Sequence, residues 1–325
     1  MQPSELSIIL PVKNTEQELP GILQSLETQT EGLEKEIIVV DMGSKDRTVW
    51  EAVQFIKEGK VRGCVVQNGP GTVPAALNTG LQKAGGEYVS FIFARRLYRD
   101  FIRGYLETAR RFEADLVYGS ASESESKLAS RRAINILAPK RMTGPELLKE
   151  ILRGNLQMDI SALLFRRSLL LENHILFEIT DSAGYTEEFI YRCLLASKMP
   201  VQSPTVMRRN TELEMKRGKT ANFGKSIFLY VDSMRRIETK IKACCPDQKN
   251  LIDLFEHEKI PSVILRCVDI LLNEGESVSQ IRQYLRQGGY DRLLQVNRRT
   301  SAPLYRRVKC WKHMPLLYRP AKEEQ

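Results

Sequence analysis

Two adjacent arginines, Arg95 and Arg96, follow an apolar run at residues 88–93. A guanidinium group is charged at every physiological pH, and its planar fork of donors fits the oxygens of a phosphate group. Such a pair directly after a buried strand therefore favours a phosphate-containing ligand. Arginines that are solvated, or paired with acids on the surface, would give the same pattern, so that alternative stays open.

Carboxylates that could bind a ligand or accept a proton occur in two places. Asp41 follows the apolar run 36–40, where it fits either a ligand-binding strand end or a local turn. Glu187 and Glu188 open a stretch with helical spacing, and Asp181 precedes them. A carboxylate can act as a general base, but in the first turn of a helix it also stabilises the helix dipole. Both interpretations stay open.

The sequence shows no grouping of residues that is typical of a metal site. Its six cysteines lack the CxxC or Cys/His spacing of zinc ligands. The three histidines are isolated and receive no role: His174, His257 and His313. We therefore assign no metal ligand.

Alternating strands and helices must position the candidate side chains. Apolar runs predict strands at residues 6–12, 36–40, 63–67 and 88–93. Between them, apolar residues at helical spacing predict helices at residues 16–28, 48–58 and 73–84. Strands that are apolar on both faces and alternate with helices predict a parallel sheet covered on both sides. Ligands bind at the carboxyl ends of such strands, so one edge is expected to gather residues 11–14, 41–44, 68–72 and 93–96.

The pattern changes to helices alone after about residue 210. These helices are predicted at residues 223–242, 250–273 and 278–286. The sequence therefore predicts an α/β domain at residues 1–214 and a basic helical C-terminal region at residues 215–325.

Three motifs in this order resemble the start of a family 2 glycosyltransferase. They are SIILPVKN at residues 7–14, IIVVDMGSKDRT at residues 37–48, and NTG with AGGEYV at residues 78–80 and 84–89. The resemblance covers roughly residues 6–210 and implies a GT-A fold, a Rossmann-like and mostly parallel sheet with flanking helices. Family members transfer a sugar from a nucleoside diphosphate donor, commonly a UDP-sugar, to an acceptor hydroxyl with inversion at the anomeric carbon.

The resemblance implies a nucleotide pocket at the ends of the first strands. Asp41 would hydrogen-bond the nucleobase or ribose, with Pro11 and Asn14 supplying the first loop. Asn78 would contact the nucleotide, or else bond locally within its helix. Met42 stands where family members often carry a second Asp.

The metal motif of the family is replaced in this sequence. Family members place an Asp-x-Asp pair after the fourth strand to hold Mg²⁺ or Mn²⁺, and here the stretch 93–96 reads Phe-Ala-Arg-Arg. Either Arg95 and Arg96 meet the charge of the diphosphate directly, or catalysis has been lost. A divalent metal cofactor is therefore doubtful.

The base position also departs from the family pattern. Members carry an acidic pair before a Phe and an Arg, and with Phe189 and Arg192 setting the register the base position falls on Thr186, which cannot serve at neutral pH. A shift of the preceding loop would bring in an acid. Three acids are the candidates for the catalytic base: Glu188, Glu187 and Asp181.

The net charge of +9 indicates an anionic partner. In the tail at residues 298–322, basic residues (Arg298, Arg299, Arg306, Arg307, Lys309, Lys312, Arg319 and Lys322) interleave with Tyr305, Trp311, Leu316, Leu317 and Tyr318. This mixture suits an anionic membrane surface, although a tail that packs its aromatics on the protein and leaves its charges solvated would look the same. Nucleic acid is not expected, because no RNA- or DNA-binding motif occurs.

We expect a glycosyltransferase of polysaccharide or glycolipid assembly, with a saccharide or lipid-linked acceptor. Since no apolar run could span a bilayer and residues 1–5 lack the features of a secretory signal, we expect it in the cytoplasm, with the tail able to meet the inner face of the cell membrane. The competing hypothesis is a catalytically inactive, glycosyltransferase-like scaffold or regulatory partner.

Overall fold

The computed structural model describes residues 4–59, 61–122, 142–180, 183–213 and 223–321. Contacts divide the chain into two compact units. The sheet unit comprises Met1–Leu147, Leu156–Ile179 and Arg192–Gly218. The helical unit comprises Leu148–Asn155, Thr180–Tyr191 and Lys219–Gln325. The sequence predicted a single boundary near residue 214. In the structure, two short segments before that position, Leu148–Asn155 and Thr180–Tyr191, also belong to the helical unit.

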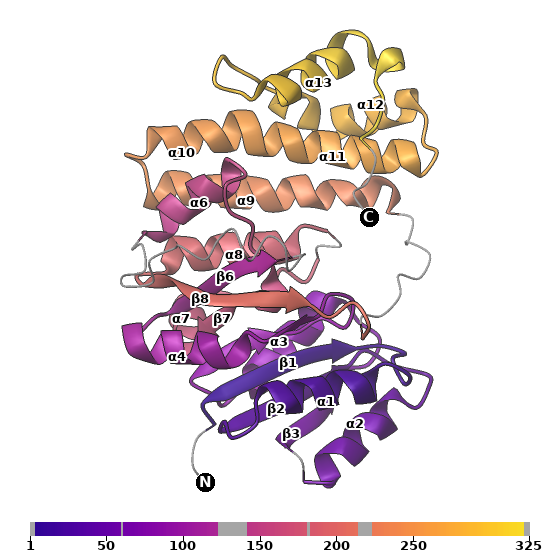
Figure 1. Ribbon diagram of the computed structural model, residues 1–325. Coiled ribbons are helices and arrows are strands. Elements are labelled where there is room, and N and C mark those ends of the chain that lie inside the picture. Colours follow the sequence, from indigo (N-terminus) through magenta and orange to yellow (C-terminus); the bar gives the residue numbers. More distant parts are fainter. Residues whose placement is uncertain (1–3, 60, 123–141, 181–182, 214–222, 322–325) are drawn as a thin grey trace. The chain divides into compact units, whose positions relative to one another are not determined.

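The sheet has eight strands in the order β3-β2-β1-β4-β7-β6-β8-β5 (Figure 1). Strands β3, β2, β1 and β4 are parallel, β7 pairs antiparallel with β4 and β6, β6 and β8 are parallel, and β5 pairs antiparallel with β8. Their bounds are β1 Leu6–Val12, β2 Lys35–Asp41, β3 Arg62–Gln67, β4 Tyr88–Phe91, β5 Tyr98–Arg99, β6 Leu116–Ser122, β7 Leu164–Arg166 and β8 Pro200–Arg209. The predicted α/β fold is confirmed.

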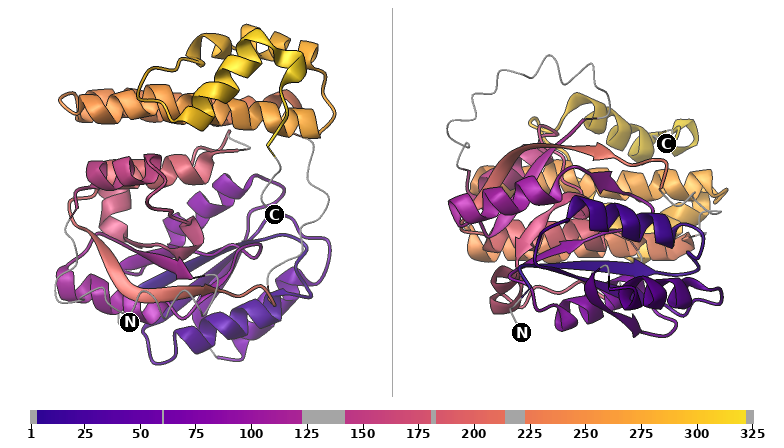
Figure 2. Two further views of the ribbon diagram at one scale, coloured as in Figure 1. Left: turned by 45° about the horizontal axis from the view of Figure 1, so that its top comes forward. Right: turned by 60° about the horizontal axis from the view of Figure 1, so that its bottom comes forward.

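Helices cover both faces of the sheet (Figures 1 and 2). Side chains of α1, α2 and α4 join one hydrophobic cluster with β1, whereas α3 contacts β1 and β2 on the other face. The helices of this part are α1 Leu19–Gln29, α2 Thr48–Lys57, α3 Val73–Lys83, α4 Ile102–Phe112, η1 Ile160–Ala162 and α7 Arg167–Glu172. Two helices, α6 Gly144–Leu152 and α8 Tyr185–Ala196, contribute residues to both units.

The side chains of β1 point alternately to the two faces of the sheet, which explains why helices pack on both faces. Leu6, Ile8 and Leu10 are fully buried in the cluster that includes α1 and α2, since successive side chains of a strand point to opposite faces. Ile9 points to the other face, where it lies against Gly80 of α3. Each fully buried Leu or Ile stabilises the fold by about 1.5–3 kcal/mol.

The helical unit is built around α11. This helix contacts α9 on one side and α12 and α13 elsewhere, and α10 continues toward it through a π-helical turn, η3 (Figures 1 and 2). Its elements are η2 Gly224–Phe228, α9 Leu229–Cys244, α10 Lys249–Leu254, η3 Phe255–Lys259, α11 Ile260–Asn273, α12 Val278–Gln287, η4 Tyr290–Leu293, α13 Ala302–His313 and η5 Pro315–Leu317. Among the described residues, no helix is long and apolar enough to cross a membrane.

The helix predicted at residues 250–273 is interrupted by that π-helical turn. Pro261 lies in the first turn of α11, and a proline there has no N–H to continue a regular helical ladder. The sequence analysis did not predict α4, β5, β6, β8 or α13. The strand predicted at residues 88–93 is β4, which is shorter than predicted. It ends at Phe91, because the chain turns sharply between Phe93 and Arg96.

We expect Gly80→Val to lower the free energy of unfolding by about 1–3 kcal/mol, because overpacking a core forces side chains and backbone to shift. A Cβ atom at Gly80 would lie 2.4 Å from Cγ2 of Ile9. Gly85→Val is the control, since a Cβ there has its nearest neighbour at 3.5 Å, on the flexible Glu36 side chain. Urea denaturation of both variants checks this, and equal losses would contradict the close approach of α3 to β1.

Candidate active site

The loops after β1 and β2 are tied together by reciprocal hydrogen bonds. The Asn14 amide donates to Oγ of Ser44 at 2.9 Å, and Oδ1 of Asn14 accepts from the Lys45 amide at 2.8 Å. Asn14 has a φ of 50°, a left-handed conformation that asparagine tolerates better than most residues. The two loops therefore behave as one pre-formed rim at the carboxyl ends of the strands.

A second layer of bonds lies just behind this rim. The Thr15 amide donates to Oγ1 of Thr48 at 2.7 Å, and that hydroxyl donates to Oδ1 of Asp46 at 2.6 Å. Burial opposes ionisation of Asp46, but hydrogen bonds from the Thr48 hydroxyl and from backbone amides outweigh it and hold the pKa of this carboxyl below its usual value. The sequence analysis gave Asp46 no structural role. The sequence feature that could have indicated this role is the motif Lys-Asp-Arg-Thr at the start of α2.

Asp41 is buried, with 3% of its surface exposed. Its carboxylate accepts from the Gly43 amide at 3.1 Å and from the Ser44 amide at 3.2 Å, which closes a tight turn. A carboxylate offers about four lone-pair sites, so acceptor capacity remains for a ligand. Pro11 lies within β1 beside Val40 of β2, close to the same edge. Nucleotide binding by Asp41, Pro11 and Asn14 stays a prediction.

Asn78 uses both ends of its amide within the protein. Its Nδ2 donates to the carbonyl of Phe177 at 2.8 Å, and its Oδ1 accepts from the Phe177 amide at 2.8 Å. Thr72, the N-cap of α3, donates to the carbonyl of Ile179 at 3.3 Å. Asn78 thus fixes the chain segment after α7 against α3, and its predicted contact with a nucleotide is untested.

The arginine pair lies on a tight turn after β4. The Arg96 amide donates to the Phe93 carbonyl at 3.0 Å, and both arginine side chains are exposed. Nε of Arg96 lies 2.7 Å from Oδ2 of Asp159. Since 57% of the Arg96 side-chain surface is exposed, solvent and a ligand can still reach its guanidinium group.

Asp159 was not among the predicted site residues. Besides Arg96, it accepts from the hydroxyl of Tyr98 at 3.1 Å and from the Ser161 amide at 2.9 Å, which caps η1. Burial, and then the charge of Asp159, raise the pKa of Tyr98 to about 12, so this phenol remains a donor at neutral pH. Only the capping pattern Asp-x-Ser marked Asp159 in the sequence, and it gives no hint of Arg96.

The residues at this turn do not fit a divalent metal. Mg²⁺ and Mn²⁺ require several oxygen ligands, and the carboxylate beside the turn, Asp159, is already bonded to a guanidinium group, a phenol and an amide. Among the described residues, no group of three or more His, Cys, Asp or Glu side chains could hold a metal ion. Positive charge at the turn comes from Arg95 and Arg96.

Glu187 of α8 lies in a polar cluster of the helical unit. Its carboxylate accepts from the hydroxyls of Tyr191 and Tyr230 and forms an ion pair with Nζ of Lys259. Burial favours the neutral acid, but the charge of Lys259 and the hydrogen bonds from Lys259, Tyr191 and Tyr230 outweigh it, so the pKa of Glu187 lies below its usual value. Glu187 is therefore ionised at neutral pH and held by three donors.

Glu188 has a different partner in the same unit. Nε of Arg236 donates to its Oε1 at 2.9 Å, and a terminal nitrogen of that arginine donates to Oε2 at 2.6 Å. Such a bidentate pair is among the strongest hydrogen-bonded contacts in proteins, and Glu188 is only 4% exposed. The third candidate base, Asp181, lies outside the described residues. The role of each acid as a base stays a prediction.

Comparisons with known proteins find glycosyltransferases. The model of glycosyl transferase family 2 matches residues 7–171. The uncharacterized glycosyltransferase YibD of Escherichia coli K12 is 23% identical over 309 residues, or 90% of this chain and 87% of YibD. Glycosyltransferase GlyA of Streptococcus pneumoniae serotype 4 is 31% identical over 125 residues, or 37% of this chain and 18% of GlyA.

Solved structures share the fold. The S. aureus TarS 1–349 structure in complex with UDP-GlcNAc has a TM-score of 0.65 at 16% identity and covers 90% of this chain and 82% of its own. Mannosyltransferase PcManGT from Pyrobaculum calidifontis, in complex with GDP-Man and Mn²⁺, has a TM-score of 0.53 at 16% identity and covers 95% and 84%. Both support the GT-A fold that the sequence predicted.

Glu187→Gln should lower the free energy of unfolding by about 1–3 kcal/mol at pH 7, because Lys259 loses its charge partner. A carboxyl whose pKa is lower in the folded state contributes stability that is present above its unfolded pKa and lost as pH falls through its folded pKa. The loss of unfolding free energy caused by the substitution should therefore become smaller as the pH falls below 4.5, the ordinary pKa of a glutamate.

Urea denaturation of the wild type and the variant between pH 7 and pH 3 measures this difference. Glu34→Gln is the control, because Glu34 and its partner Arg62 are both exposed and such surface pairs contribute about 0–1 kcal/mol. A difference that stays constant down to pH 3 would show that the charge of Glu187 does not stabilise the fold.

Proposed function

Because this chain belongs to glycosyl transferase family 2, we propose that it binds a nucleoside diphosphate sugar at the edge formed by the loops after β1, β2 and β4. The observation that carries the proposal is the pre-formed rim in which Asn14 and Ser44 join the first two loops. The sugar is transferred to a hydroxyl of a saccharide or lipid-linked acceptor, in polysaccharide or glycolipid assembly. The UDP-GlcNAc in the TarS structure supports a UDP-sugar as donor.

In the proposed complex the nucleoside lies against the ends of β1 and β2. Asp41 accepts a hydrogen bond from the nucleobase or ribose while its turn amides hold the carboxylate in place. The backbone of Pro11 and Asn14 lines the other side. Asn78 either contacts the nucleotide itself or contributes through the segment around Phe177, which its amide fixes.

The diphosphate is met by arginines in this proposal. As the bond between the anomeric carbon and the diphosphate oxygen breaks, negative charge builds on the leaving group, and fixed cations aimed at that charge lower the barrier. Arg95 is exposed on the turn, and Arg96 is oriented by Asp159. Their guanidinium groups can each donate two parallel hydrogen bonds to phosphate oxygens. No step of this mechanism passes through a metal ion.

The acceptor hydroxyl must lose its proton as it attacks the anomeric carbon from the face opposite the leaving group, which inverts that centre. We assign the base to Glu188, with Glu187 and Asp181 as the alternatives. Both glutamates are paired with cations, so their carboxylate oxygens already have partners. Glu188 therefore has to separate from Arg236 before it can act.

That pairing also favours a second function, a nucleotide-sugar-binding protein without turnover that serves as a scaffold or regulatory partner. It is supported by the ion pairs of the two carboxylates, and by arginines where the resemblance to the family leads one to expect a metal motif. The two functions differ in turnover but share donor binding, so they can be separated experimentally.

Donor binding should survive removal of metal ions. Calorimetric titration with UDP, UDP-sugars and GDP-mannose is expected to give the same affinity in Mn²⁺ and in EDTA. Arg95→Gln should weaken binding by roughly 10-fold or more, the effect of losing a hydrogen bond to a charged group. Arg99→Gln, a change of another exposed arginine, is the control and should have little effect. Binding that requires Mn²⁺ would contradict arginines acting in place of a metal.

If Glu188 is the base, Glu188→Gln should lower UDP release in the presence of acceptor by about 100-fold to 10,000-fold while donor affinity is unchanged. Glu238→Gln is the matched control, since Glu238 is also an ion-paired glutamate of the helical unit. Equal rates for wild type and Glu188→Gln would assign the base elsewhere. Donor binding without any turnover across an acceptor panel would support the scaffold function.

A further inference from the structure

Helix α13 presents one buried and one cationic face. Leu304, Val308 and Trp311 are buried at helical spacing. The opposite face carries exposed basic side chains, Arg306 and Lys309. Since a helix repeats every 3.6 residues, these positions lie about half a turn from the buried stripe. The helix therefore packs through one side and directs positive charge into solvent on the other.

An apolar tip directly follows this helix. Met314, Leu316 and Leu317 at η5 are exposed to 53%, 78% and 64%. Among the described residues, three of the eight exposed large apolar side chains are these, and they fall within four consecutive positions. Apolar surface gathered in one place and flanked by polar residues is typical of an interaction site.

The tip is held in place from its far side. Tyr318 is buried, its hydroxyl donates to Oδ1 of Asp269 in α11 at 2.8 Å, and Arg307 pairs with the same carboxylate. The rings of Trp311 and Tyr318 pack edge to face with centroids 5.2 Å apart. For these two aromatics the sequence left open either a membrane surface or packing on the protein, and both lie in the core of the helical unit. The exposed apolar groups are instead those of the tip.

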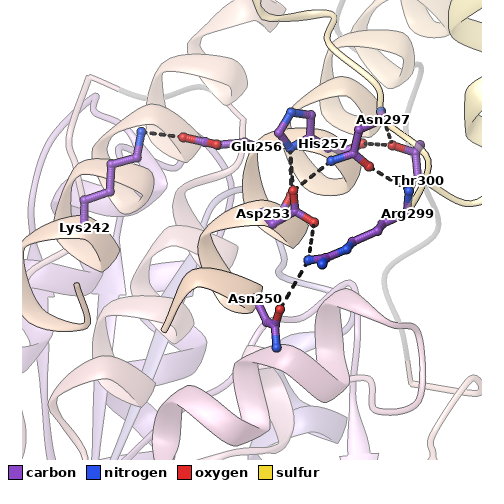
Figure 3. Close-up of polar contacts among 8 residues, drawn as sticks. All are labelled: Lys242, Asn250, Asp253, Glu256, His257, Asn297, Arg299 and Thr300. Carbon is purple, nitrogen blue, oxygen red and sulfur yellow. Dashed lines mark hydrogen bonds and ion pairs between the residues drawn. The ribbon is translucent and has the colours of Figure 1, made fainter. Parts of the chain in front are cut away.

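The start of α13 is fixed as well (Figure 3). Asn297 donates to Oδ1 of Asp253 at 2.8 Å, and Thr300 donates to the carbonyl of His257 at 3.0 Å. Ser301, the N-cap residue of α13, bonds to Glu258 through its amide at 2.8 Å. With both ends anchored to α10, η3 and α11, the cationic face and the apolar tip have a fixed spatial relation.

We propose that α13 and η5 form a docking surface for an anionic lipid membrane, which we call the lipid-docking surface. Basic side chains meet anionic headgroups while Leu316 and Leu317 enter the boundary between headgroups and acyl chains. Each basic residue near such a surface strengthens binding on the order of fivefold. The proposal does not depend on sugar transfer, because it concerns contacts of the helical unit alone.

Co-sedimentation of the full chain with vesicles tests the proposal. At 0.1 M salt, the wild type should bind vesicles of 70% phosphatidylcholine and 30% phosphatidylglycerol and leave pure phosphatidylcholine vesicles unbound. Leu316→Ser/Leu317→Ser should lower the partition coefficient at least about tenfold, as should Arg306→Glu/Lys309→Glu. Raising the salt to 0.5 M should weaken wild-type binding, because salt screens the headgroup charge.

Leu171→Ser/Leu176→Ser is the matched control, since these leucines of the sheet unit are exposed to 44% and 41%. It should bind vesicles like the wild type, and unchanged thermal unfolding should show that all the variants are folded. The proposal is overturned if the wild type does not bind the anionic vesicles, or if the tip variant binds as well as the control. Equal binding to neutral vesicles would also overturn it.

Discussion

The reciprocal bonds between the loops after β1 and β2 are the constraint on which the site depends. A parallel sheet brings strand ends to one edge, but the loops that follow are free to move unless something holds them. Asn14 and Ser44 supply that restraint in front, and Asp46 and Thr48 supply it behind. A ligand that binds here meets polar groups already in place, which reduces the entropy lost on binding.

The proposed site differs in its electrostatics from the pattern expected of the family. In the proposed complex, the positive charge that a diphosphate leaving group needs comes from Arg95 and Arg96, on the turn after β4. An arginine is bulky and mobile, whereas a divalent ion is compact and sits at a defined distance from its ligands. Asp159 compensates in part, because it limits the orientations of the Arg96 guanidinium group.

The helical unit does more than extend the chain. Lys259 and Tyr230 hold Glu187, and Arg236 holds Glu188, so the start of α8 is fixed by side chains of α9 and η3. This agrees with the grouping of residues 180–191 in the helical unit. Carboxylates that are hydrogen-bonded in this way specify the position of a helix well.

The sequence by itself determined the first four strands, β1 to β4, and the three helices between them, since Ile8, Val39 and Val89 lie in local apolar runs whose period marks the element. It also placed Asp41, Arg95 and Arg96 at strand ends, because chain order alone puts them there. Only the tertiary structure decided the partners: Asp159 for Arg96, Phe177 for Asn78 and Lys259 for Glu187. It also decided that Trp311 is buried while Leu316 is exposed. These pairings join residues far apart in the chain, and local periodicity carries no information about which distant side chain will pack beside a given one.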